Sequence, residues 1–109
     1  MESKTENFVL KRDGERNLSF TGQLIADYSD KGYNSSRWTD YRLYQTVGGK
    51  YIFESEYITL WQGEDDRHSA IVFDNIARLV KFLEDNYGMS DMVKEFAVSL
   101  GVDLSEKVD

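Results

Sequence analysis

The hydrophobic pattern has a period of two residues over most of the chain and changes to a helical period near the C-terminus. The clearest alternation runs from Tyr51 to Trp61. One face carries Tyr51, Phe53, Ser55, Tyr57, Thr59 and Trp61, and the other carries Ile52, Glu54, Glu56, Ile58 and Leu60. Because both faces are partly apolar, this run is expected to be a central strand with material packed on each side.

Four further segments favour strands, and a fifth remains open. Phe8–Arg12 and Leu18–Phe20 flank Asp13-Gly14, a pair typical of hairpin turns. Residues 37–46 form another predicted strand, followed by a turn at residues 47–50, and residues 69–73 have β-branched and aromatic content. Residues 22–28 allow two interpretations: a helical face, or a continued strand after a bulge at Gly22.

The last third predicts two helices. Asp74 or Asn75 is placed to cap a helix that ends near Tyr87, with Gly88 as its left-handed cap. Ser90 is placed to cap a second helix, which Gly101 closes. The apolar helix positions are Ile76, Ala77, Leu79, Val80, Phe82, Leu83, Met92, Val93, Phe96, Ala97 and Leu100.

Strands come first and helices last, without strand–helix alternation, so the expected class is α+β. We expect an antiparallel meander of about five strands followed by two C-terminal helices packed on one face. The 109 residues suit a single domain, 1–109, with about 1–6 and 104–109 frayed.

Composition narrows the classes of function. The chain has no cysteine, which removes disulfides, thiolate metal sites and thiol nucleophiles. Its start is polar and no run is apolar enough to span a bilayer, so we expect a cytoplasmic protein without a membrane partner. The net charge of −7 disfavours direct nucleic-acid binding. The asymmetry is strong, since residues 54–109 hold thirteen acids and five bases.

Chemistry-bearing residues are sparse. His68 is the one histidine, and it follows Glu64, Asp65 and Asp66, whose spacing matches no known metal-binding loop. A solvated loop is the favoured interpretation, and a small enzyme or ligand binder using His68 with Asp65, Asp66 or Tyr57 is the alternative. Gly48-Gly49-Lys50 lacks the spacing of a phosphate-binding loop and indicates a hairpin turn in which the two glycines supply two consecutive positive φ values. We assign no catalytic, cofactor-binding or metal residues.

Two sets of residues make a candidate interaction surface. The aromatic set is predicted mainly to form core, with an exposed protein-binding face or a base-stacking platform as alternatives. The acidic set is predicted to be a solubilising surface, with imitation of duplex charge as the alternative. The aromatic candidates are Trp38, Tyr44, Tyr51, Tyr57 and Trp61, and the acidic candidates are Glu84, Asp85, Asp91 and Glu95.

Five short motifs resemble those of a group of small uncharacterised bacterial proteins found near plasmid, phage or other mobile-element genes. They are Phe20-Thr21-Gly22, Arg37-Trp38-Thr39, Leu43-Tyr44-Gln45-Thr46, Gly48-Gly49-Lys50-Tyr51 and Trp61-Gln62-Gly63-Glu64. The resemblance covers about residues 8–85. It implies a bacterial cytoplasmic protein and carries no activity or site residue.

The sequence therefore favours a non-enzymatic protein-interaction or regulatory role with a protein partner. An acidic, nucleic-acid-mimicking inhibitor of a DNA-acting enzyme is one alternative, and the His68 enzyme or ligand binder is another. Pairing of two copies through a free strand edge also stays open.

Overall fold

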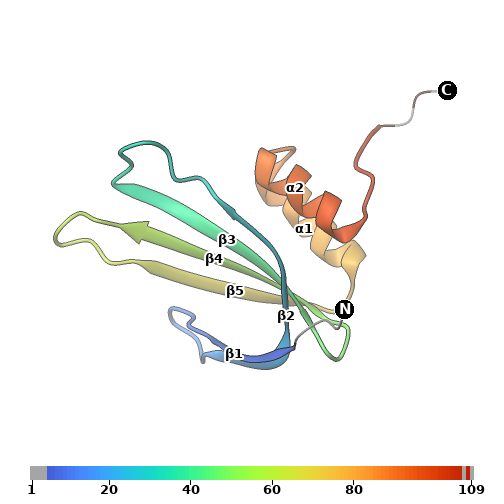
Figure 1. Cartoon of the computed structure of the whole chain (residues 1–109), viewed down its shortest axis with the longest axis horizontal. Coiled ribbons are helices and arrows are strands. Elements are labelled where there is room, and N and C mark those ends of the chain that lie inside the picture. Colours follow the sequence, from blue (N-terminus) through green and yellow to red (C-terminus); the bar gives the residue numbers. More distant parts are fainter. Residues whose placement is uncertain (1–4, 107, 109) are drawn as a thin grey trace.

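A computed structural model describes residues 5–106 and 108 of the chain. Five strands precede two helices, which confirms the predicted α+β class and element order (Figure 1). The strands are β1 (Glu6–Leu10), β2 (Leu18–Ser29), β3 (Arg37–Thr46), β4 (Tyr51–Thr59) and β5 (Arg67–Phe73). The helices are α1 (Ile76–Tyr87) and α2 (Asp91–Leu100). None of the helices in the described part is long and apolar enough to cross a membrane.

The strands form one antiparallel sheet in chain order, β1-β2-β3-β4-β5. Both helices pack on one side of it, which we call the helix face (Figure 1). The helix-face core contains Leu43 and Phe53, which are paired across β3 and β4, with Leu79, Leu83, Met92, Val93 and Phe96 from the helices. The apolar helix positions predicted from the sequence are buried or partly buried, except for Ala77, which is exposed.

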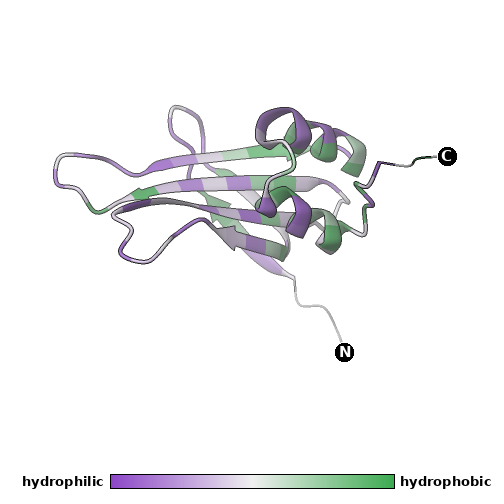
Figure 2. Cartoon of the chain, turned by 90° about the horizontal axis from the view of Figure 1, so that it is seen from above, coloured by the Kyte–Doolittle hydropathy of each residue, from purple (hydrophilic) through white to green (hydrophobic). Residues whose placement is uncertain are grey.

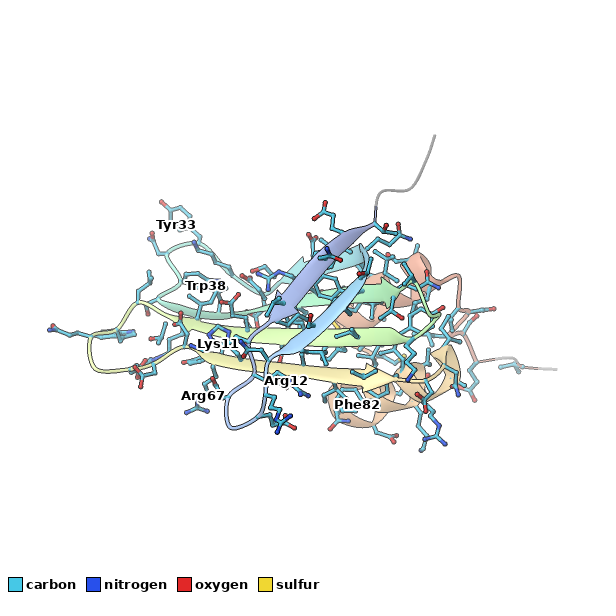
Figure 3. The ribbon with its side chains drawn as sticks, turned by 90° about the horizontal axis from the view of Figure 1, so that it is seen from below. Lys11, Arg12, Tyr33, Trp38, Arg67 and Phe82 are labelled. Carbon is cyan, nitrogen blue, oxygen red and sulfur yellow. The ribbon has the colours of Figure 1, made fainter. Side chains whose placement is uncertain are left out.

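The opposite side, which we call the hairpin face, is partly covered by β1 and the first half of β2, which cross obliquely beneath the other strands (Figure 3). A second core forms there from Leu10, Tyr44, Ile52 and Ala70, with Phe8, Leu18 and Phe20 packed against it. Because β4 contributes Phe53 to one core and Ile52 to the other, the expectation that material packs on both of its faces is confirmed.

Strand β2 bends, so its two halves pack in different layers of the fold. Residues 22–28 continue β2, which resolves the strand-or-helix alternative, but the register shifts between Leu24 and Ala26 and not at Gly22. A bulge bends the strand that carries it. Gly22 pairs with both Glu6 and Thr46, and a Cβ there would overlap the Gln45 carbonyl oxygen. The glycine is needed for close approach of two strands.

Several local expectations are corrected in detail. The first hairpin has a longer connection than predicted, because β1 ends at Leu10 and not at Arg12. In the second turn only Gly49 has a positive φ, so that turn needs one glycine in the left-handed region and not two. Gly88 has a φ of 61° but a ψ of −144°, which is outside the left-handed helical region.

The remaining boundaries follow the predicted signals. Asn75 caps α1 by accepting a hydrogen bond from the Arg78 N–H, and Ser90 caps α2 in the same way through the Val93 N–H. Gly101 closes α2 in the left-handed conformation. Of the ends expected to fray, Glu6 begins β1 and Leu104 packs on the helix-face core, while residues 1–4, 107 and 109 lie outside the described residues.

Candidate functional site: the open end of the sheet

The helices cover only one end of the sheet, and β3, β4 and β5 extend beyond them (Figures 1 and 2). We call residues 37–41, 55–59 and 67–69, with the β4–β5 loop, the open end. Cross-strand register places Arg37 opposite Thr59, and Thr39 opposite Tyr57. Alternation along each strand then puts these side chains on the same face as Leu43 and Phe53, but past the helices.

Two arginine–aromatic pairs occupy the open end. The Arg37 guanidinium lies 5.3 Å from the centre of the Trp61 ring, and the Arg67 guanidinium lies 5.7 Å from that of Tyr57. Both distances are within the range of cation–π attraction. Trp61 is 54% exposed, yet its indole N–H donates to the Ser36 hydroxyl oxygen at 2.8 Å, which fixes the ring in place.

Arg37 is also held by Glu64. Its Nε and Nη2 donate to the two carboxylate oxygens at 2.9 and 2.7 Å, and the Thr59 hydroxyl donates to the same carboxylate at 2.6 Å. The hydrogen bonds from Arg37 and Thr59 lower the pKa of Glu64 to about 2. The hydrogen bond to Glu64 raises the pKa of Arg37 in turn. The β4–β5 loop is therefore tied to β3.

A polar cleft of about 1020 Å³ opens beside this loop. His68 lines it from β5, with its side chain 19% exposed, so the histidine lies on a strand and not in the solvated loop that the sequence favoured. Two of the three acids beside it in the sequence are engaged in the fold: the Asp66 carboxylate accepts the Thr59 N–H at 3.0 Å, and Glu64 binds Arg37, whereas Asp65 is exposed. The complete lining is Lys11, Asp13, Tyr57, Thr59, Gly63, Glu64, Asp65, Asp66, Arg67 and His68.

A narrower groove lies where the α1–α2 turn meets the sheet. It consists of two depressions that share Tyr41 and Tyr87, whose rings meet edge to face with centres 5.6 Å apart. Burial raises the pKa of Tyr41, and the nearby Asp30 charge adds to this; burial also raises the pKa of Tyr87. Both hydroxyls are therefore neutral donors and acceptors at ordinary pH.

The hairpin face carries a charged network that the sequence analysis missed. Glu54 is buried and accepts hydrogen bonds from the Tyr44 hydroxyl at 2.8 Å and from Arg42 Nη1 at 3.1 Å. Arg42 Nη2 donates to Glu56 at 3.2 Å, and His68 Nδ1 lies 3.8 Å from the same carboxylate. Glu54 and Glu56 stand two positions apart in β4, so their side chains share a face and can pair with residues of the neighbouring strands. This spacing was the sequence signal that could have revealed the network.

This network also sets the protonation of its members. Burial raises the pKa of Tyr44, and its hydrogen bond to Glu54 raises it further. Partial burial lowers the pKa of Arg42, but its hydrogen bonds to Glu54 and Glu56 outweigh that effect and raise it overall. The network joins β3 to β4, and among the described residues no fully buried side-chain nitrogen or oxygen lacks a hydrogen-bond partner.

The aromatic candidates read from the sequence are divided among different places. Tyr44 is buried in the hairpin-face core and Tyr51 packs against the helix-face core, so neither belongs to an open surface. Trp38 lies at the open end of the hairpin face, where the Lys31 ammonium sits 4.3 Å above its ring. Of the aromatic candidates, Tyr57 and Trp61 lie at the open end of the helix face, each against a different arginine.

The acidic candidates lie on the helices and are exposed, but bases are interleaved with them. Lys81 Nζ pairs with Asp85 at 3.1 Å. Across the two helices, Glu84, Asp85, Asp91 and Glu95 are offset by Arg78, Lys81 and Lys94. The helical surface is therefore nearly neutral, and no feature of it favours imitation of nucleic acid.

Within residues 5–106 and 108, no group of three or more histidine, aspartate and glutamate side chains is placed to hold a metal ion. Comparison with known protein families, curated proteins and solved structures finds no match to this chain. The resemblance to small bacterial mobile-element proteins stays a prediction.

Proposed function

We propose that this chain is a non-enzymatic protein-binding module whose binding surface is the open end of the sheet. The observation that carries the proposal is the pair of ordered arginine–aromatic contacts there, Arg37 with Trp61 and Arg67 with Tyr57. Tryptophan, tyrosine and arginine are the residues most enriched among those that dominate protein–protein binding energy.

Order in the unbound surface supports the proposal. Trp61 is held by Ser36, and Arg37 by both oxygens of Glu64, so these long side chains lose little freedom when a partner covers them. Side-chain ordering otherwise costs about 0.5–1.5 kcal/mol for each immobilised residue in an interface. A surface fixed before binding is what a recognition module requires.

The state of the polar groups supports a role without catalysis. At the open end Asp66 accepts the Thr59 N–H, and Glu64 is occupied by Arg37 and Thr59. A general acid or base needs a proton site directed at a substrate. We also propose that the protein acts in a bacterial cytoplasm, because the chain contains no cysteine and resembles small bacterial proteins.

Site-specific photocrosslinking tests the proposal. A benzophenone amino acid replaces Trp61 in one sample and Val98, which is 80% exposed on α2, in a matched control. Both proteins are expressed in the organism that encodes the chain. We expect a discrete protein adduct from position 61 and none from position 98. Adducts of the same mass from both positions, or none from position 61, would contradict the proposal.

Truncation of the aromatic side chain measures its contribution once the partner is in hand. We expect Trp61→Ala to weaken the complex by about 2 kcal/mol, as for a central interface tryptophan, and Val98→Ala to leave it unchanged. Isothermal titration calorimetry with the crosslinked partner gives both values. Equal effects from the two variants would place the interface elsewhere.

The His68 cleft supports a second candidate function, the binding of a small polar ligand. His68 has only 19% of its side chain exposed and lines a cleft together with Lys11 and Arg67. Figure 3 labels these two basic residues. NMR screening of a fragment library should then shift the His68 imidazole and Gly63 amide signals together. Shifts confined to the helices would remove this candidate.

A further inference from the structure

The groove beneath the α1–α2 turn has an uneven distribution of charge along its length. Its two depressions measure about 270 and 290 Å³ and meet at Tyr41 and Tyr87. Arg67 lies at the β5 end, while Asp30 and Asp91 lie at the β2 end. The two depressions together span four strands from a cationic end to an anionic one, with the packed rings of Tyr41 and Tyr87 between them.

The charges at both ends are available to a ligand. Arg67 contacts the Tyr57 ring, but among the described residues no carboxylate forms an ion pair with it. Asp91 likewise forms no ion pair within the described part of the chain, whereas Arg37, Arg42 and Lys81 are all paired. Asp30 accepts the Thr39 N–H through one carboxylate oxygen, which leaves the other free to accept.

The floor of the groove offers hydroxyl groups between the charged ends. Thr39, Ser55 and Ser69 come from the adjacent strands β3, β4 and β5 and line the same depression. The hydroxyls of Ser55 and Ser69 bond to no other described side chain or backbone group. A hydroxyl both donates and accepts, so this row matches the alternating N–H and C=O groups of an extended peptide.

The length of the groove sets the length of the ligand. From β5 to β2 there are three strand spacings, or about 14 Å. An extended chain rises about 3.3 Å per residue, so charges at the two ends of the groove match side chains about four positions apart. We infer that the groove binds an extended peptide segment carrying an acidic and a basic side chain at this spacing. This inference rests on the proposed function and names the chemistry of its partner.

Nucleic acid fits this groove less well than a peptide. A phosphate chain would meet Arg67 favourably but would be repelled by Asp30 and Asp91 at the other end. A peptide with opposite charges meets a complementary group at each end. Tyr41, Tyr57 and Tyr87 add large, rigid contact area for its side chains.

Binding of synthetic peptides to the full chain tests the inference by fluorescence anisotropy. The first probe is a capped seven-residue peptide with glutamate at its second position, lysine at its sixth, and threonine and valine elsewhere. The second has the same composition with the two charged residues adjacent. We expect the spaced peptide to bind about tenfold more tightly, because only it reaches both ends. Equal affinities, or tighter binding of labelled oligothymidylate, would overturn the inference.

A charge reversal gives a second, independent readout. Arg67→Glu makes both ends of the groove acidic, so this variant should prefer a peptide with lysine at both the second and sixth positions. Arg78→Glu changes the net charge equally but lies at the start of α1, away from the α1–α2 turn, and should keep the original preference. Circular dichroism verifies that both variants fold. An unchanged preference in Arg67→Glu would overturn the inference.

The two proposals fail separately. Trp61 lines neither depression of the groove, so crosslinking at position 61 reports on the open end without the peptide groove. A protein adduct at position 61 with no peptide preference would leave the proposed function standing and remove only the groove. Peptide preference without an adduct would keep a peptide-binding role in the groove and remove Trp61 from the binding surface.

Discussion

Asp13 and His68, separated by 55 positions in the sequence, are joined by two hydrogen bonds. The Asp13 N–H donates to the His68 carbonyl oxygen at 3.0 Å, and the His68 N–H donates to the Asp13 carboxylate at 2.8 Å. The tip of the first hairpin is thereby fastened to the edge strand β5. Both backbone groups of His68 are occupied, which shortens the free edge of the sheet.

Removing the Asp13 carboxylate should weaken the contact between the first hairpin and β5. We expect Asp13→Ala to lower the free energy of unfolding by about 1 kcal/mol, because one hydrogen bond to an exposed charged acceptor is lost. Asp65→Ala is the matched control, since Asp65 is exposed and bonds to no other described residue. Urea denaturation measures both. Equal midpoints for the two variants would show that the fastening contributes nothing.

Loss of the buried carboxylate should cost more. Glu54→Ala leaves the Tyr44 hydroxyl without its acceptor and removes one of the carboxylates that hold Arg42, so we expect a loss of about 3 kcal/mol. Glu56→Ala, at a more exposed position of the same strand, should lose about 1 kcal/mol. Guanidinium denaturation distinguishes them. A larger loss from Glu56→Ala would contradict the assignment of Glu54 as the central acceptor.

The depressed pKa of Glu64 predicts acid sensitivity. Its pKa falls from 4.5 to about 2 in the fold, so the stabilisation it provides is complete above pH 4.5 and disappears as the pH drops through about 2. We expect the stability difference between wild type and Glu64→Gln to shrink over this interval. Thermal unfolding at successive pH values follows it, and carbon NMR of the carboxyl group gives the pKa directly. A difference independent of pH would refute the ion pair with Arg37.

Gly22 is predicted to tolerate no side chain. A Cβ at this position overlaps the Gln45 carbonyl oxygen, so Gly22→Ala must push β2 away from β3, and we expect a loss of about 2–3 kcal/mol. Gly48→Ala is the control, because its nearest neighbour, the Thr46 hydroxyl oxygen, is 3.8 Å away. That variant should stay within about 0.5 kcal/mol of wild type by urea denaturation. If Gly22→Ala and Gly48→Ala lost similar stability, the loss would come from replacing a flexible glycine and not from overlap with the Gln45 carbonyl oxygen.

Local signals in the sequence were sufficient for every element except the second half of β2, residues 22–28, for which a helix also fitted. The two-residue period of Tyr51–Thr59 follows from strand geometry alone, and the capping by Asn75, Ser90 and Gly101 depends on residues within one turn. Such determinants act between neighbours in the chain. The α+β class and the order of strands and helices were therefore predictable.

The candidate surface was only partly predictable, because burial depends on what covers each face. Tyr44 and Tyr57 have similar positions in their strands, but residues of the first hairpin pack on Tyr44, whereas Tyr57 is only partly buried and is contacted by Arg67. Arg67 and Asp91 were likewise separate charges in the sequence and became the two ends of one groove.

The sequence by itself determined which segments are strands and helices, apart from residues 22–28, and which residues share a face, since these depend on period and on capping. The tertiary structure decided that β2 bends, that the first hairpin folds beneath the sheet, and that the helices leave one end open. These outcomes arise from contacts between distant segments, such as Asp13 with His68 and Gly22 with Gln45, whose energies no local pattern contains.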